Sequence, residues 1–125
     1  AAVRLPVTVA AVVAMDLVLD PGAVSLGFWS YAGGGPYYAV PLQNYAGWVL
    51  SATVSVGALD RAFDRTPLLD RLAACEFALD DLVSFVLLWA GVNLWFGNLA
   101  PVAVAAVFGA GLVQTDRFDA GALRP

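Results

Sequence analysis

Residues 15–48 read MDLVLDPGAVSLGFWSYAGGGPYYAVPLQNYAGW. The segment begins with two aspartates four residues apart, Asp16 and Asp20, and continues through a Pro-Gly pair and a run of glycines set among aromatic residues. No charged residue occurs from Pro21 to Leu59, although this interval is rich in groups that hydrogen-bond or stack. A charge-free segment with so many polar and aromatic groups requires an unusual environment.

The composition identifies that environment as a lipid bilayer. The chain has 125 residues, of which 61% are hydrophobic and 13% charged, whereas soluble domains are roughly 45–50% apolar and about 25% charged. A soluble protein of this length needs more charged surface, so the composition predicts a membrane protein. We expect one membrane domain over residues 1–125, forming the C-terminal portion of a longer polytopic protein.

Several classes of chemistry and partner are excluded by the same composition. The chain has no histidine and one cysteine, Cys75, so an internal disulfide framework and histidine-based metal or triad chemistry are ruled out. We expect Cys75 to be a small buried apolar residue, and we predict no metal site and no cofactor. The net charge of −4, with arginine as the only basic residue type, suits a salt-loving organism and argues against nucleic acid as a partner.

The pattern of apolar runs predicts an all-α fold, a polytopic transmembrane bundle of about four spanning helices. Pro21 and Gly22 are expected to end the first helix, and Pro41 suits the first turn of the second. The charge-free run at 82–115 would extend about 51 Å as one helix, too long for a hydrocarbon core of about 30 Å, so it should break at Gly97-Asn98. The expected helices are about 4–20, 41–59, 72–96 and 99–115, with an aromatic, glycine-rich interfacial or re-entrant loop at 21–40 and a tail at 116–125.

Four alternating spans place every arginine at one side of the membrane. These residues lie near the N-terminus, in the charged segment 60–71, and after Thr115. The positive-inside tendency makes that side cytoplasmic. We therefore expect an integral protein of the cell membrane whose Arg-bearing loop and C-terminus are cytoplasmic and whose aromatic loop faces outward.

Carboxylates in or beside the predicted spans are the first candidates for function, because an unpaired charge at mid-helix costs at least about 2.5–3.5 kcal/mol. Asp16 and Asp20 share a helix face, and two carboxylates so close repel, so one should hold a proton near neutrality and could act as a general acid. Counting about 1.5 Å per residue from the arginines puts Asp20 and Asn44 at one depth. A possible second carboxylate group comprises Glu76, Asp80 and Asp81.

Plainer interpretations stay open for each of these features. Asp20 could be an ordinary helix-end residue at the interface, and Glu76 could pair with a nearby arginine. The aromatic residues could form an interface belt, and the glycine run could be a flexible turn. The acidic run at 76–81 could hold a hard divalent cation, although no second acidic motif supports it.

The segment resembles the signature of the carotenoid hydratases of the bacterioruberin pathway, membrane carotenoid-biosynthesis proteins of the bisanhydrobacterioruberin hydratase type. Their pattern is D-x-x-x-D-P, then W-x-Y, a glycine and tyrosine pair, and V-P-x-x-N-(aromatic)-x-G-W. Ala39 stands where the family pattern has glycine. The matching residues are Asp16, Asp20, Pro21, Trp29, Tyr31, Gly35, Tyr37, Tyr38, Pro41, Asn44, Gly47 and Trp48.

The resemblance implies hydration of a terminal C=C bond in an acyclic C50 or C40 carotenoid, giving a tertiary alcohol without a cofactor. Asp16 or Asp20 would be the acid, and Asn44 with Gln43 would hold the water. Aromatic faces would stabilise the cation; the candidates are Trp29, Tyr31, Tyr37, Tyr38 and Trp48. The implied partners are membrane lipid, the carotenoid polyene and other membrane enzymes of carotenoid biosynthesis.

Two other functions stay open at this stage. A carotenoid end-group cyclase would protonate the same alkene and form the same cation, so that only access of water distinguishes the two enzymes. A non-catalytic membrane subunit, or a proton-conducting bundle that uses the buried acids, belongs to a different class. Product mass and proton flux separate these alternatives.

Overall fold

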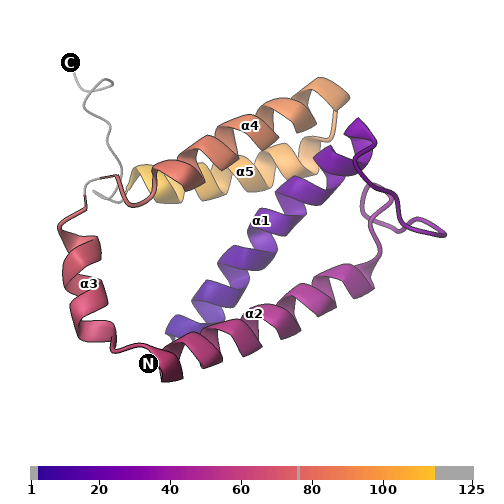
Figure 1. Cartoon of the computed structure of the whole chain (residues 1–125). Coiled ribbons are helices and arrows are strands. Elements are labelled where there is room, and N and C mark those ends of the chain that lie inside the picture. Colours follow the sequence, from indigo (N-terminus) through magenta and orange to yellow (C-terminus); the bar gives the residue numbers. More distant parts are fainter. Residues whose placement is uncertain (1–2, 76, 115–125) are drawn as a thin grey trace, which may run out of the picture.

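The computed structural model describes residues 3–75 and 77–114, and in this part of the chain the regular elements are all helices, which confirms the all-α class (Figure 1). A single bridge between Tyr37 and Val40 is the extent of β pairing there. The five helices are α1 (Arg4–Leu26), α2 (Leu42–Ala62), α3 (Arg65–Ala73), α4 (Asp80–Phe96) and α5 (Leu99–Val113).

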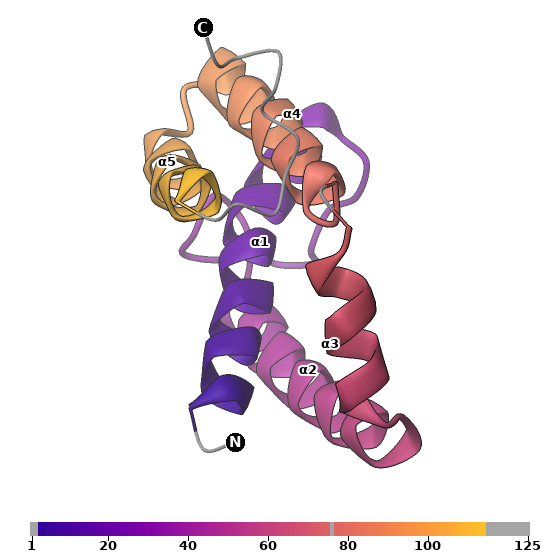
Figure 2. The same cartoon turned by 90° about the vertical axis from the view of Figure 1, so that its left-hand side faces the viewer.

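Helix α1 is the element on which the others assemble. It packs against α2 on one side and against both α4 and α5 on the other. The last two form an antiparallel pair that crosses the C-terminal half of α1, while α3 stands apart as a connection between α2 and α4 (Figures 1 and 2). The polar groups of α1 are therefore covered from two directions.

The prediction that Pro21 and Gly22 end the first helix is wrong, because α1 continues through both residues to Leu26. Proline within a helix removes one N–H and leaves the carbonyl four residues earlier without its usual donor. That carbonyl belongs to Leu17, and it accepts a hydrogen bond of 3.0 Å from the Tyr37 hydroxyl. The helix ends instead at Gly27, which adopts the left-handed conformation (φ 76°) typical of a C-terminal cap.

The third predicted helix, about 72–96, is also corrected, since the chain forms two helices with a break between Ala74 and Leu79. Helix α3 begins earlier, where the Asp64 side chain accepts a hydrogen bond from the backbone N–H of Thr66. Helix α4 begins at Asp80, so Asp80 and Asp81 occupy its first turn, where negative charge is favourable. They do not lie midway along a span. The predicted end of the fourth helix at Thr115 lies outside the described residues.

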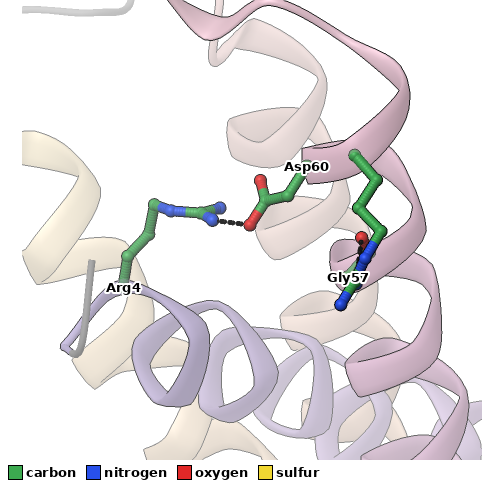
Figure 3. A network of polar contacts seen from close by, with 4 residues as sticks. Arg4, Gly57 and Asp60 are labelled. Carbon is green, nitrogen blue, oxygen red and sulfur yellow. Dashed lines mark hydrogen bonds and ion pairs between the residues drawn. The ribbon is translucent and has the colours of Figure 1, made fainter.

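The two ends of the α1–α2 pair differ in chemistry. At one end Arg4 forms an ion pair with Asp60, and Arg61 donates to the carbonyl of Gly57 within α2 (Figure 3). At the opposite end lies the aromatic loop 27–41, which joins α1 to α2 (Figure 1). The antiparallel arrangement therefore separates the arginine-bearing end from the aromatic end by the length of both helices.

Two positions in the loop explain its glycine content. A Cβ atom on Gly35 would lie 2.1 Å from the backbone carbonyl of Val40, so only glycine fits where the chain turns back on itself. Ala39 has a positive φ of 65°, a region that L-residues other than glycine occupy at a cost of about 1–2 kcal/mol. Glycine, which the resemblance leads us to expect at this position, would adopt this conformation without that cost.

Helix α1 is, among the described residues, the one helix long and apolar enough to cross a bilayer by itself, and α5 is apolar but shorter. Large apolar side chains are exposed on the other helices as well. Leu87 and Leu88 of α4 are 70% and 61% exposed, and Trp95 is 86% exposed. The molecule thus presents an apolar exterior around a small polar interior.

Candidate active site

The polar interior is built on two aspartates of α1. Asp16 is 5% exposed and Asp20 is 3% exposed, and the spacing of four residues places both on one face of the helix. The first arginine of the chain, Arg4, lies twelve residues before Asp16, about 18 Å along the helix axis. The two carboxylates are therefore buried beside each other and far from that cation.

Asn44, in the first turn of α2, joins the two carboxylates. Its Nδ2 atom donates a hydrogen bond of 2.9 Å to Oδ2 of Asp16 and a second, short one to Oδ2 of Asp20. A side-chain amide has two N–H groups, so both are used. One amide thus bridges two acids and fixes α2 against α1 at this level.

The loop supplies a further donor to Asp20. The Tyr31 hydroxyl donates a hydrogen bond of 2.9 Å to Oδ2 of Asp20. Burial, together with the hydrogen bond to Asp20, raises the pKa of Tyr31 to about 12. Tyr31 therefore stays a neutral hydrogen-bond donor at any physiological pH.

Tyr37 and Tyr38 use their hydroxyls to hold the loop on the helices. Tyr37 donates to the carbonyl of Leu17, between the two aspartates, and the Tyr38 hydroxyl accepts a hydrogen bond of 3.2 Å from the backbone N–H of Ala100. Their rings meet edge to face at 5.0 Å. Burial raises the pKa of Tyr37 to about 12. Both residues anchor the aromatic loop over the site.

The other two predicted binding residues line an open groove beside Asn44. Gln43 and Trp48 border a space of about 320 Å³ on α2, together with Asn44, Gly47 and Ser51. Trp48 is 42% exposed. The groove reaches from the exterior of the helix pair to the amide that bridges the carboxylates.

The suggested second carboxylate group is not joined to this pair. Asp80 and Asp81 lie in the first turn of α4, whereas α4 contacts the site helix through Trp89 and Asn93, roughly two to four turns later. Within residues 3–75 and 77–114 no three acidic or cysteine residues gather as a metal site would require. Glu76 lies outside the described residues.

Residues of α4 and α5 that sequence reasoning missed support the other side of α1. Asn93 is fully buried, and its Nδ2 atom donates to the carbonyl of Val18 at 2.7 Å. Asn98 donates to Oδ1 of Asn93 and to the Ser25 hydroxyl, each at 3.0 Å. An asparagine inside an otherwise apolar run was the available signal, because a buried amide must find partners.

Close packing reinforces this support at Gly22. A Cβ atom there would lie 2.9 Å from the ring of Trp89 and 3.2 Å from Nδ2 of Asn93. Glycine after Asp20-Pro21 thus lets α4 approach the backbone of α1 directly behind the carboxylates. In three successive positions, the Asp-Pro-Gly sequence supplies an acid, a proline that leaves the Leu17 carbonyl to the Tyr37 hydroxyl, and a close contact with α4.

A family model described as carotenoid biosynthesis protein matches residues 1–112 of the chain. The chain belongs to this family. A curated family relative, the bisanhydrobacterioruberin hydratase of Haloarcula japonica, is 58% identical over 117 residues. The match covers 94% of the present chain but 40% of the relative, so the chain spans less than half the length of that protein. No solved structure matched the chain.

Proposed function

We propose that this chain forms the proton-transfer site of a membrane-embedded carotenoid hydratase. The reaction adds water to a terminal C=C bond of an acyclic C50 carotenoid and gives a tertiary alcohol, in line with the name of the Haloarcula relative. The observation that carries the proposal is the pair of buried carboxylates, Asp16 and Asp20, bridged by the single amide of Asn44.

The unequal surroundings of the two carboxylates suggest which one is the acid. Oδ2 of Asp20 accepts hydrogen bonds from both Tyr31 and Asn44, while Oδ2 of Asp16 accepts from Asn44. Donors stabilise the ionised form of a carboxylate. Asp16 therefore holds the shared proton and delivers it to the alkene, and Asp20 remains ionised and stabilises the cation that forms.

The chemistry needs no cofactor, because the proton and the water are the reactants. The O–H bond of the carboxylic acid breaks as a C–H bond forms at the less substituted carbon, leaving a tertiary cation. The oxygen of water bonds to that cation, and its proton returns to the carboxylate pair. Exclusion of bulk water strengthens the interaction of Asp20 with the cation.

We also propose that α1, α2, α4 and α5 lie within the membrane, with the aromatic loop at the outer boundary. Support comes from the exposed apolar side chains of these helices and from the separation of Arg4 and Asp60 from the loop. Tryptophan and tyrosine are enriched at membrane boundaries, and arginine on the cytoplasmic side. The substrate end group would then lie under the loop, with its polyene in the apolar layer.

The decisive experiment expresses the full-length protein with an unhydrated acyclic C50 carotenoid and measures the mass of the pigment. Hydration adds one water to each reacting end, whereas cyclisation leaves the mass unchanged. We expect Asp16→Asn and Asp20→Asn proteins to accumulate in the membrane and to lose at least about 100-fold in rate. Asp70→Asn, which neutralises an exposed carboxylate of α3, is the matched control and should retain activity.

Full hydration by both the Asp16 and Asp20 variants would refute the assignment of the acid pair. An unchanged pigment mass with the parent protein would refute the hydratase itself. Proton flux in carotenoid-free liposomes, abolished by the same two variants, would favour a proton-conducting bundle instead.

A further inference from the structure

Tyr45 stands at the aromatic position of the family pattern, and it carries a buried hydroxyl that the acid pair does not explain. It follows Asn44 in α2 and is 9% exposed, and its hydroxyl is buried without a hydrogen-bond partner in the described part of the chain. A buried hydroxyl left unsatisfied costs about 1–3 kcal/mol. A buried polar group without a partner calls for an explanation, and binding of a water or a ligand is one.

The position of Tyr45 directs it toward the carboxylates. Tyr45 and Ala52 are the buried residues of α2, and their spacing of seven places both on the face packed against α1. The Tyr45 ring meets the Tyr37 ring edge to face at 5.9 Å, and Tyr37 is bonded to the carbonyl of Leu17, between Asp16 and Asp20.

The other donors around the pair are already committed. Both N–H groups of Asn44 bond to the carboxylates, Tyr31 bonds to Asp20, and Tyr37 bonds to Leu17. The hydroxyl of the fourth tyrosine, Tyr38, accepts a hydrogen bond from the backbone N–H of Ala100, at the start of α5. Tyr45 is thus the tyrosine, among the described residues, whose hydroxyl is buried without any hydrogen-bond partner.

We infer that the Tyr45 hydroxyl binds the water molecule that is added to the substrate. The inference rests on the proposed hydratase activity and assigns its second step. A phenol donates one hydrogen bond and accepts another, so Tyr45 can hold a water while the carboxylate pair accepts the proton that this water loses. Oxygen–carbon bond formation and return of the proton to the pair then complete the addition.

The test is Tyr45→Phe in the full-length protein, assayed with the unhydrated acyclic carotenoid in D₂O. The ring and its contact with Tyr37 are kept, so the variant should fold, with thermal stability equal to or above that of the parent. We expect hydration to fall at least about tenfold. Protonation continues, so the cation loses a proton again, and deuterium enters the recovered alkene without an added hydroxyl.

Thr53→Val is the matched control, because it removes another α2 hydroxyl whose bond, to the carbonyl of Val49, lies within its own helix. It should hydrate like the parent. Hydration at the parent rate by Tyr45→Phe would overturn the inference while leaving the proposed function intact. Loss of both hydration and deuterium exchange, or loss of the fold, would also overturn it, because Tyr45 would then serve protonation or packing. Absence of hydration in the parent itself would instead defeat the proposed function.

Discussion

Replacing Asn44 measures how strongly one amide holds two helices and two acids together. Its Nδ2 atom donates to Asp16 and to Asp20. A hydrogen bond to a charged acceptor contributes about 1.5–3 kcal/mol and one to a neutral acceptor about 0.5–1.5 kcal/mol. If the pair shares one proton, one bond of each kind is lost. Asn44→Leu, which leaves little room for a replacing water, should therefore destabilise the fold by about 2–4 kcal/mol.

The assay is thermal unfolding of the purified full-length protein in detergent, followed by far-UV circular dichroism. The expected loss corresponds to a fall in Tm of roughly 5–15 °C. The Tm of Asn44→Ala should fall less than that of Asn44→Leu. The smaller side chain opens a space beside two carboxylates, and a water there can replace part of the lost hydrogen bonding. Thr53→Val serves as the control on the same helix, since its hydroxyl bonds within that helix.

A compensating variant tests the same reasoning from the other direction. With Asn44→Leu already in place, Asp16→Asn supplies a new amide on α1, one turn from Asp20, and removes one of the two buried acids. The double variant should recover a measurable part of the lost Tm, although not the activity. A Tm of Asn44→Leu within 1 °C of the parent, or a double variant less stable than Asn44→Leu, would refute the bridging role.

Three further predictions follow from the same contacts. Gly22→Ala should destabilise the fold by about 1–3 kcal/mol, because the new methyl group meets the Trp89 ring. Gly47→Ala is the control, since a methyl group there meets nothing within 4 Å. Equal Tm values for the two variants would contradict the close packing at Gly22. Ala39→Gly should stabilise by up to about 1 kcal/mol by relieving its positive φ, as chemical denaturation would show. The pKa of Tyr31 is raised to about 12 in the folded state, against about 10 when unfolded. The folded state therefore binds this proton more tightly, and this contribution to stability is lost as pH rises from about 10 through 12. Tyr31→Phe should reduce that fall in Tm, and an unchanged pH profile of Tm would refute the raised pKa of Tyr31.

The helical class and the carboxylate pair could be predicted from sequence because they depend on local information. Apolar run length predicts helices, and spacing of four places Asp16 and Asp20 on one face. The end of α1 could not be predicted. Pro21 normally terminates a helix, and what rescues it, the Tyr37 hydroxyl on the Leu17 carbonyl, is a tertiary contact.

The hydrogen bonds from Asn93 and Asn98 to α1 could not be predicted from sequence for a similar reason. Asn93 and Asn98 lie in a run that hydropathy treats as a single apolar segment, and their partners on α1 are more than seventy residues away in sequence. The role proposed for Tyr45 could not be predicted from sequence either, because it depends on the absence of a hydrogen-bond partner for its buried hydroxyl in the folded structure. The sequence pattern therefore identified the acids and their donors Asn44 and Tyr31, whereas the buried groups behind them, Asn93 and Asn98, are defined only by the packing of the helices.

The two-sided support of α1 also constrains the path of the substrate. Behind the acids, Gly22 is in contact with Trp89, and Asn93 is bonded to the Val18 carbonyl, so α4 closes that side. Above them, the loop is bonded to α1 through Tyr37 and to the start of α5 through Tyr38. We propose that the substrate approaches through the groove on α2, because Gln43, Trp48 and the bridging Asn44 all line it. A polyene entering there would need to insert only its terminal double bond, while the remainder would stay among the exposed apolar side chains. Substitution of Gly47, in the floor of this groove, by leucine should therefore raise KM far more than it lowers kcat, and an unchanged KM would place the entry elsewhere.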